Sequence, residues 1–225
     1  MRWPSIEPVG GWRTVIQEIL IVVAGVLIAL GAQQLVDGWQ WRRKVGDFRA
    51  AIDAELGRNL ESYRLRIEQR QCVRDRLNQL GAWADAHEAG EGGRLRNAIS
   101  RPLGVRLQFS VWDQAGEAAS HMPLQQRLAY AELYDEFRNY DWLRVREREL
   151  WFDIRNHQGA RRLSDERQLD LRGMIVAAHS IDDSMAINWR SVRHKAAALG
   201  IRPLRDPEQP DWLRNLCDPL RWEER

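Results

Sequence analysis

The chain has 225 residues and a mass of 26.3 kDa, which suits one ordinary domain with an appendage or two small domains. Hydrophobic residues make up 44% and charged residues 29%, so the composition favours folding and excludes a wholly disordered chain. The 34 Lys and Arg residues nearly balance the 32 Asp and Glu residues, and the net charge of +2 argues against a dedicated nucleic-acid-binding protein.

The most distinctive segment follows an N-terminal tail of residues 1–14. Its uninterrupted apolar run, Ile19 to Ala32, has 14 residues and is shorter than the roughly 20 that a membrane span needs. The wider stretch from Val15 to Val36 has 22 residues, and a helix of that length, roughly 33 Å, crosses a bilayer. The sequence therefore predicts a single transmembrane helix over residues 15–36.

The flanks of this helix carry residues typical of the membrane interface, where amphipathic rings and basic groups favour the headgroup layer. They are Trp12, Trp39, Trp41, Arg42, Arg43 and Lys44. Gly25 and Ala29 form a small-xxx-small pair that permits close helix–helix contact, and either a dimer or chance explains it.

A cleaved signal peptide is the alternative, because Ala29-Leu30-Gly31 resembles a processing site and cleavage there releases a secreted helical protein. We favour an uncleaved anchor, since Glu18 interrupts the approach to the apolar run and the helical pattern continues past the cleavage point.

Apolar residues at spacings of three and four continue this helix to about residue 88 as one long amphipathic helix. The other face mixes charges of both signs, which predicts a solvated surface. Its members are Arg49, Asp53, Glu55, Arg58, Glu61, Arg64, Arg66, Glu68, Arg70 and Arg74. Glycines at 90–93 end the helix.

Further helices are expected over 109–122, 123–156 and 164–199, with Ser110 or Asp113 and then Ser164 or Asp165 as caps. The last of these helices has a coiled-coil-like row at seven-residue spacing: Leu171, Ala178, Met185, Val192 and Leu199. No segment alternates with period two, so we expect no sheet. The fold class is all-α, an antiparallel helical bundle over 37–200, with a Pro-rich tail (201–225, including a short amphipathic piece at 212–216) packing on it.

No sequence motif predicts catalysis or a bound cofactor. The one alternative is a metal-dependent enzyme built from His121, His179, Asp182, Asp183 and His194, whereas we favour ordinary helical salt bridges at these positions. Two cysteines are too few for a disulfide scaffold. In an oxidising compartment Cys72 and Cys217 can pair and tie the tail to the first long helix, but we expect unpaired, buried thiols.

Two segments resemble a known family. The first runs from Glu18 through the apolar span and Trp39 to Ile52-x-x-Glu55-Leu56-x-x-Asn59-Leu60, and the second is Trp112-Asp-Gln-Ala-Gly-Glu-Ala-Ala-Ser-His-Met122-Pro followed by Arg127-x-x-Tyr130 and Tyr134. Together they are similar to the bacterial group named domain of unknown function 6090. The resemblance implies a single-pass membrane protein with a helical domain, and it implies no catalytic residues. The N-terminal tail here is less basic than is usual in that group.

Two arguments about the side of the membrane oppose each other. Arg2 and Arg13 precede the span while four basic residues follow it, which favours a cytoplasmic bundle. Short N-terminal tails nevertheless commonly stay inside while a large domain crosses, and we favour a periplasmic bundle on the bacterial inner membrane. The expected function is that of a non-enzymatic scaffold, accessory subunit or sensing ectodomain, with the lipid bilayer and a protein partner or second copy as its contacts and no nucleic acid.

Overall fold

The computed structural model describes residues 11–204 and 214–223. In those residues the regular elements are helices, joined by non-helical segments, and one isolated β-bridge links Leu95 and Trp222. The helices are α1 (Gly11–Glu68), α2 (Arg70–Glu88), α3 (Ser110–Asp113), α4 (Gly116–Ser120), α5 (Leu124–Arg155), α6 (Asp165–Ala198) and α7 (Arg214–Cys217). The predicted all-α class is confirmed.

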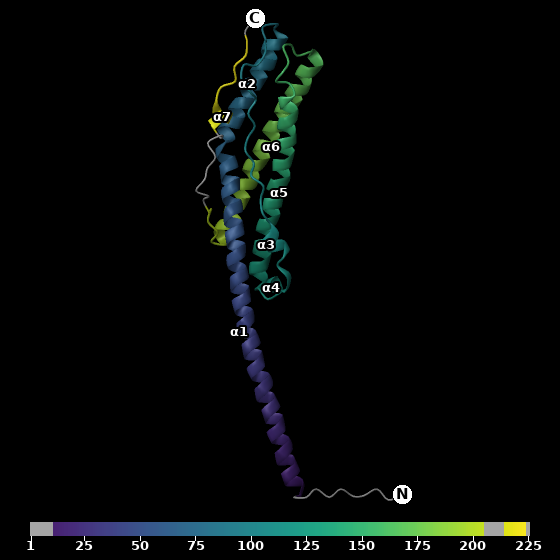
Figure 1. Ribbon diagram of the computed structural model, residues 1–225, viewed down its shortest axis with the longest axis vertical. Coiled ribbons are helices and arrows are strands. Elements are labelled where there is room, and N and C mark those ends of the chain that lie inside the picture. The colour runs from purple at the N-terminus through teal and green to yellow at the C-terminus, as the bar shows by residue number, and fades with distance from the viewer. Residues whose placement is uncertain (1–10, 205–213, 224–225) are drawn as a thin grey trace, which may run out of the picture.

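Helix α1 has two halves with different surroundings. Its N-terminal half projects alone from the molecule, and its C-terminal half joins the bundle (Figure 1). The first of its residues to pack against the bundle core are Val45 and Phe48, and Ile52 and Leu56 are fully buried. The prediction of an apolar helix that continues into an amphipathic one is therefore confirmed.

The expectation of one unbroken helix to residue 88 is wrong at Gln69, where a turn separates α1 from α2. The Gln69 side chain accepts a hydrogen bond from the Leu103 N–H and donates to the carbonyls of Leu65 and Leu103. This side chain thus ties the helix junction to the crossing segment 91–109. Such contacts between a side chain and the backbone compete with the regular helical pattern.

Helices α5 and α6 form the rest of the bundle. Helix α5 runs alongside α1 and α2 from the end of the bundle at which α1 projects to the distal end, and α6 returns antiparallel to it (Figure 1). Ser164 caps α6 by accepting a hydrogen bond from the Arg167 N–H, as predicted. The seven-residue row faces the core, because Leu171, Ala178, Met185 and Val192 are all buried.

The core forms two clusters along the bundle. The cluster nearer the projecting half of α1 is rich in aromatic rings, with Tyr63 stacked on Tyr140 at a centroid distance of 3.7 Å. The distal cluster is organised around Trp83 and Trp151, and it includes Leu216 from the C-terminal tail. Burial of these large rings supplies much of the hydrophobic stabilisation of the bundle.

The predicted helix over 109–122 is two short helices, α3 and α4, and the predicted caps are wrong, because Phe109 occupies the N-cap of α3. A carboxylate from α1 takes the capping role: Glu55 accepts hydrogen bonds from the Ser110 hydroxyl and the Val111 N–H. Glu55 also accepts from the Tyr134 hydroxyl and is fully buried, which corrects its assignment to a solvated face.

The C-terminal residues 214–223 return to the distal half of the bundle. Cys72 and Cys217 form a disulfide across a sequence separation of 145 residues, so the expectation of unpaired thiols is wrong. Next to this disulfide, Leu216 packs in the distal cluster, which brings the two cysteines together. The guanidinium of Arg76 donates to the carbonyls of Leu216 and Asp218. Trp212 and Leu213, part of the predicted amphipathic piece, lie outside the described residues.

Candidate membrane anchor and buried charge network

The apolar half of α1 has no partner within the described part of the chain. It contains a stretch long and apolar enough to cross a membrane, and none of that stretch is buried. Gly25 and Ala29 lie on the same side of the helix, because residues four apart share a helical face. A Cβ added at Gly25 meets nothing within 4 Å. This side of the helix is open to a neighbouring helix or to lipid.

The predicted interface residues divide between the anchor and the bundle. Trp12 and Trp39 are exposed, with 75% and 57% of their surfaces accessible. Trp41 instead stacks on His121 at the end of α4, with ring centroids 3.8 Å apart and an interplanar angle of 16°. The ammonium group of Lys44 lies 4.6 Å from the centre of the Trp41 ring. Trp41 therefore marks the point at which the bundle meets the projecting half of α1.

Arg43 and Arg42 remain exposed beside this junction, and the Arg43 guanidinium lies 5.9 Å from the Trp39 ring centre. Trp41 is five residues beyond Val36, so the stacked pair lies about 8 Å further along the helix. That is comparable with the thickness of one headgroup layer, about 5–8 Å.

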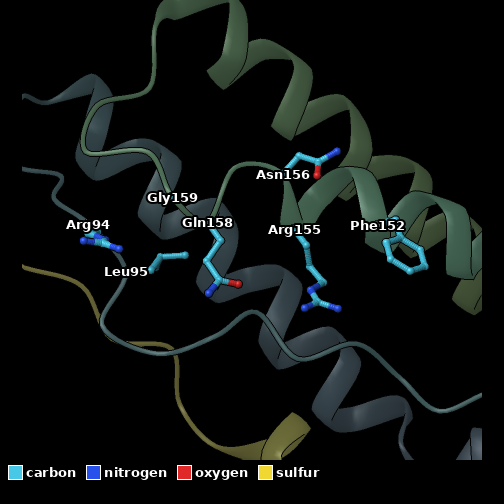
Figure 2. A pocket seen from close by; sticks show the side chains of 7 residues that line it. All are labelled: Arg94, Leu95, Phe152, Arg155, Asn156, Gln158 and Gly159. Carbon is cyan, nitrogen blue, oxygen red and sulfur yellow. The ribbon is translucent and has the colours of Figure 1, made fainter.

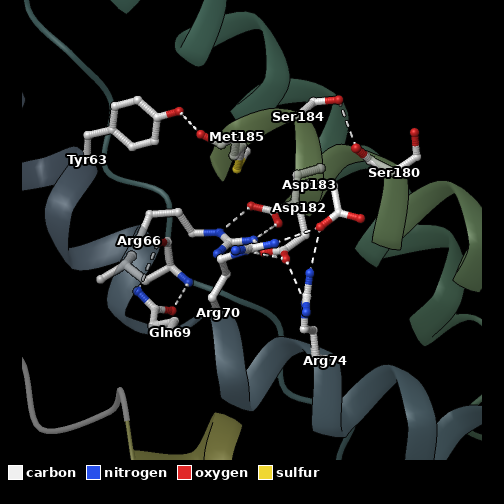
Figure 3. Close-up of polar contacts among 12 residues, drawn as sticks. Tyr63, Arg66, Gln69, Arg70, Arg74, Ser180, Asp182, Asp183, Ser184 and Met185 are labelled. Carbon is white, nitrogen blue, oxygen red and sulfur yellow. Dashed lines mark hydrogen bonds and ion pairs between the residues drawn. The ribbon is translucent and has the colours of Figure 1, made fainter. Parts of the chain in front are cut away.

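A buried ionic network lies deeper in the bundle, next to the junction of α1 and α2 (Figure 3). The Arg66 guanidinium is fully buried and donates to Glu147 of α5 and, at 3.1 Å, to Asp182 of α6. Burial opposes the charge on Arg66, but attraction and hydrogen bonding by Glu147 outweigh it and raise the pKa of the guanidinium above its ordinary value. One group therefore links three long helices.

Two further arginines extend the network to the surface. The Arg70 guanidinium donates to Asp182 at 2.8 Å and to Asp183 at 2.6 Å, and Arg74 donates to Asp183 at 2.6 Å. The hydrogen bond from Arg74 is the largest influence on Asp183 and holds the pKa of its carboxyl below the usual range. Both aspartates are thus engaged by arginine.

The structure does not bring together the residues of the metal-dependent alternative. Asp182 and Asp183 bind arginines, His121 stacks on Trp41, and His194 is exposed near the end of α6. Across residues 11–204 and 214–223, no group of three or more His, Cys, Asp or Glu side chains is placed to hold a metal ion. The arrangement at Asp182 and Asp183 is that of structural ion pairs.

A seam between the crossing segment 91–109 and α5 contains two hollows. The distal hollow has a volume of about 410 Å³ and is bordered by Arg94, Leu95, Phe152, Arg155, Asn156, Gln158 and Gly159. In Figure 2, the Arg155 side chain extends from the end of α5 toward the crossing segment, and Gln158 lies between Arg155 and the pair Arg94 and Leu95. The hollow combines basic, amide and aromatic groups.

Sequence reasoning placed Arg66 on a solvated face and did not identify Glu147. A signal for both was present. Arg66 continues the spacing of the buried Ile52, Leu56 and Tyr63, and Glu147 stands in a seven-residue row with the buried Tyr140 and Ile154. A charged residue in an apolar row indicates a buried ion pair or a functional group, since burial of an unpaired charge is costly.

No protein-family model matches the chain, and no curated protein or solved structure matches it. The resemblance to the 6090 group therefore stays a prediction. The structure does relate the two segments that carry it: Asn59 and Glu55 of the first segment hydrogen-bond to Gln108 and Val111, which lead into Trp112 of the second. The part of the first segment around Glu55 and Asn59 therefore packs against the start of the second segment.

Proposed function

We propose that the protein is a single-pass membrane anchor carrying a helical interaction domain, without catalytic activity of its own. The observation that carries this proposal is the continuity of α1. One helix passes from a stretch without buried residues, apolar enough to span a bilayer, into the core of a packed bundle. An apolar helix with no protein cover needs lipid around it, because exposed apolar surface of this size is unfavourable in water. A rigid helical connection also fixes the bundle at the membrane surface.

The proposed side of the membrane is the oxidising, extracytoplasmic one, the periplasm in a bacterium. The Cys72–Cys217 disulfide supports this side, because cytosolic thiols are kept reduced and structural disulfides persist in the periplasm. The disulfide links α2 to the C-terminal tail, so both of these parts of the bundle would have to lie on the same side.

Reporter fusions test the orientation. Alkaline phosphatase folds only outside the cytoplasm, and a fluorescent protein exported in unfolded form stays dark there. We expect a fusion of alkaline phosphatase to the C-terminus to be active and the matching fluorescent fusion to be dark. The opposite pair of results would place the bundle in the cytoplasm and remove the proposed role for the disulfide.

Alkylation of the native protein gives an independent test. Cells treated with a maleimide polymer under denaturing, non-reducing conditions should yield an unmodified chain, because both cysteines are paired. After reduction, the same chain should gain two polymer units. Two units without reduction would show that the thiols are free in the cell and would contradict an oxidising location.

A further inference from the structure

The seam between the crossing segment and α5 holds a second hollow closer to the anchor. This hollow has a volume of about 10 Å³, enough for one water molecule or one ligand oxygen. The side chains that line it include Arg101, Arg144, Glu147, Arg148 and Trp151. Gly104 lets the segment lie directly on α5 here, because a Cβ at that position would come within 2.5 Å of the Arg144 side chain. The two hollows therefore follow one seam along the same helix.

The charge in the seam is strongly one-sided. Five arginines and a single acid line the two hollows, and the acid, Glu147, is already paired with Arg66. Arg144 is paired with Asp141 at 2.8 Å. The side chains of the remaining four make no ion pair with any carboxylate in the described part of the chain: Arg94, Arg101, Arg148 and Arg155. Neighbouring cations without counter-charges raise the local potential and attract anions.

A buried donor borders the smaller hollow. Trp151 is fully buried, and its Nε1 has no hydrogen-bond partner in the structure. Buried indole N–H groups usually have a hydrogen-bond acceptor, because a buried donor without an acceptor lowers the stability of the fold. Trp151 lies on the same face of α5 as Arg144 and Arg148, being seven and three residues further along. An oxygen placed in the hollow would accept from the indole while its charge faces the arginines.

Spacing favours an extended chain over a small ion. Arg148 and Arg155 are seven residues apart on α5, a rise of about 10 Å. In an extended polyproline II segment, every third side chain returns to the same face after about 9 Å, so two carboxylates can reach both arginines. The small hollow admits one oxygen but no aromatic base, and base stacking is what single-stranded nucleic acid needs.

We propose that this seam binds an extended acidic segment of a partner protein, with one carboxylate at Arg148 and Trp151 and another at Arg155, and with Arg94 adding positive charge at the far end of the larger hollow. The proposal rests on the proposed interaction function and names the chemistry of its partner. Arginine is the residue best suited to this role, because its planar fork binds carboxylates through two parallel hydrogen bonds. The exposed Phe152 ring would pack against the apolar part of the bound segment.

Binding of a designed peptide tests the proposal. The full chain in nanodiscs of zwitterionic phosphatidylcholine, which has no net charge, is titrated into a fluorescein-labelled heptapeptide with glutamate at every third position, separated by glycine and proline. We expect saturable binding that weakens with salt, and none for the same peptide with glutamine in place of glutamate. Arg148→Glu with Arg155→Glu should weaken binding at least about tenfold at low salt, because each reversal turns an attraction into a repulsion.

The matched control reverses two arginines outside the seam. Arg190 and Arg193 of α6 are exposed and, like the seam pair, make no ion pair with a described carboxylate. Arg190→Glu with Arg193→Glu changes the net charge equally and should alter the affinity less than about twofold, since distant charges are screened. Equal losses in both variants would show non-specific attraction and overturn the proposal.

A local probe separates the seam from the rest of the surface. Fluorotryptophan incorporated into the full chain gives one fluorine resonance for each indole, and Trp151→Phe identifies that of Trp151. The glutamate peptide should shift this resonance, and inorganic phosphate should not match its effect. An unshifted Trp151 resonance at saturation, or tighter binding of an oligothymidylate than of the peptide, would overturn the proposal. Membrane extraction and reporter fusions assess anchoring separately, so failure of peptide binding leaves that function standing.

Discussion

The two halves of α1 are built from one continuous helix and face opposite environments. Between Ile16 and Val36 every residue is exposed, and apolar side chains cover all sides of the helix. Between Ile52 and Tyr63 the apolar residues occupy one face, and Ile52, Leu56, Leu60 and Tyr63 are buried in the bundle. The change occurs near Trp41, where the helix first meets α4.

This difference shows what decides burial in a helix of uniform geometry. An apolar stripe selects a protein partner, because the opposite polar face must remain in water. A helix that is apolar on all sides would expose apolar surface to water on every face, so it needs to be buried in a protein core or a membrane. Since no part of the described bundle covers the first half, lipid is the environment that fits it.

The largest effect should come from charge placed in the first half. Val23→Arg with Leu27→Arg puts two cations into the centre of the span, at a cost of about 5–7 kcal/mol for the pair. We expect the protein to leave the carbonate-resistant membrane fraction while the purified bundle keeps its melting transition. Val176→Arg with Ile187→Arg is the matched control, because these α6 residues are 69% and 61% exposed on the bundle. Equal behaviour of the two variants would contradict a lipid environment for the first half of α1.

The second half should respond to the loss of a buried partner instead. Arg66→Met leaves the buried Glu147 without its ion-pair partner, and we expect the free energy of unfolding to fall by about 3–5 kcal/mol. Denaturant unfolding followed by circular dichroism measures this loss. Arg74→Met removes a more exposed member of the same network and should move the unfolding midpoint little. Membrane retention should be unchanged in both variants.

The Cys72–Cys217 disulfide should contribute to the stability of the distal end of the bundle. Cys72→Ser with Cys217→Ser should lower the free energy of unfolding by about 2–4 kcal/mol, because the unfolded chain gains freedom across a long loop. A reducing agent should lower the stability of the native protein to about that of the variant and leave the variant unchanged. If reduction has no effect on the native protein, the tail is held by its other contacts alone.

The smallest expected effect concerns contacts between two copies of the span. Gly25→Leu should weaken dimers in native membranes about fivefold, equivalent to about 1 kcal/mol, because the added side chain blocks close helix approach. Gly31→Leu is the control: it lies about 120° around the helix from Gly25, and neither position has a neighbour within 4 Å in the monomer. Crosslinking gives the measurement, and a solely monomeric native protein would contradict a dimer.

The sequence predicted the features that depend on local pattern. The apolar N-terminal helix, the α6 row and the cap of α6 (Ser164 of the two predicted candidates, Ser164 and Asp165) all follow from spacing or from a single side chain. Features set by long-range contacts were missed. The break at Gln69 needs the crossing segment, the cap on α3 needs Glu55 from a distant helix, and the disulfide needs the tail to return to α2. Pairing of Arg66 with Glu147 likewise depends on how three helices meet, which single-helix periodicity does not contain.

The most direct test of the account is the mass of the chain recovered from carbonate-washed membranes of expressing cells. We expect the first half of α1 to remain attached to the bundle, so intact-mass spectrometry should find a membrane-bound chain that still contains residues 15–36. A soluble chain beginning near residue 32 would contradict it. That result would mean that the apolar half is a processed signal, and that the bundle works without an anchor.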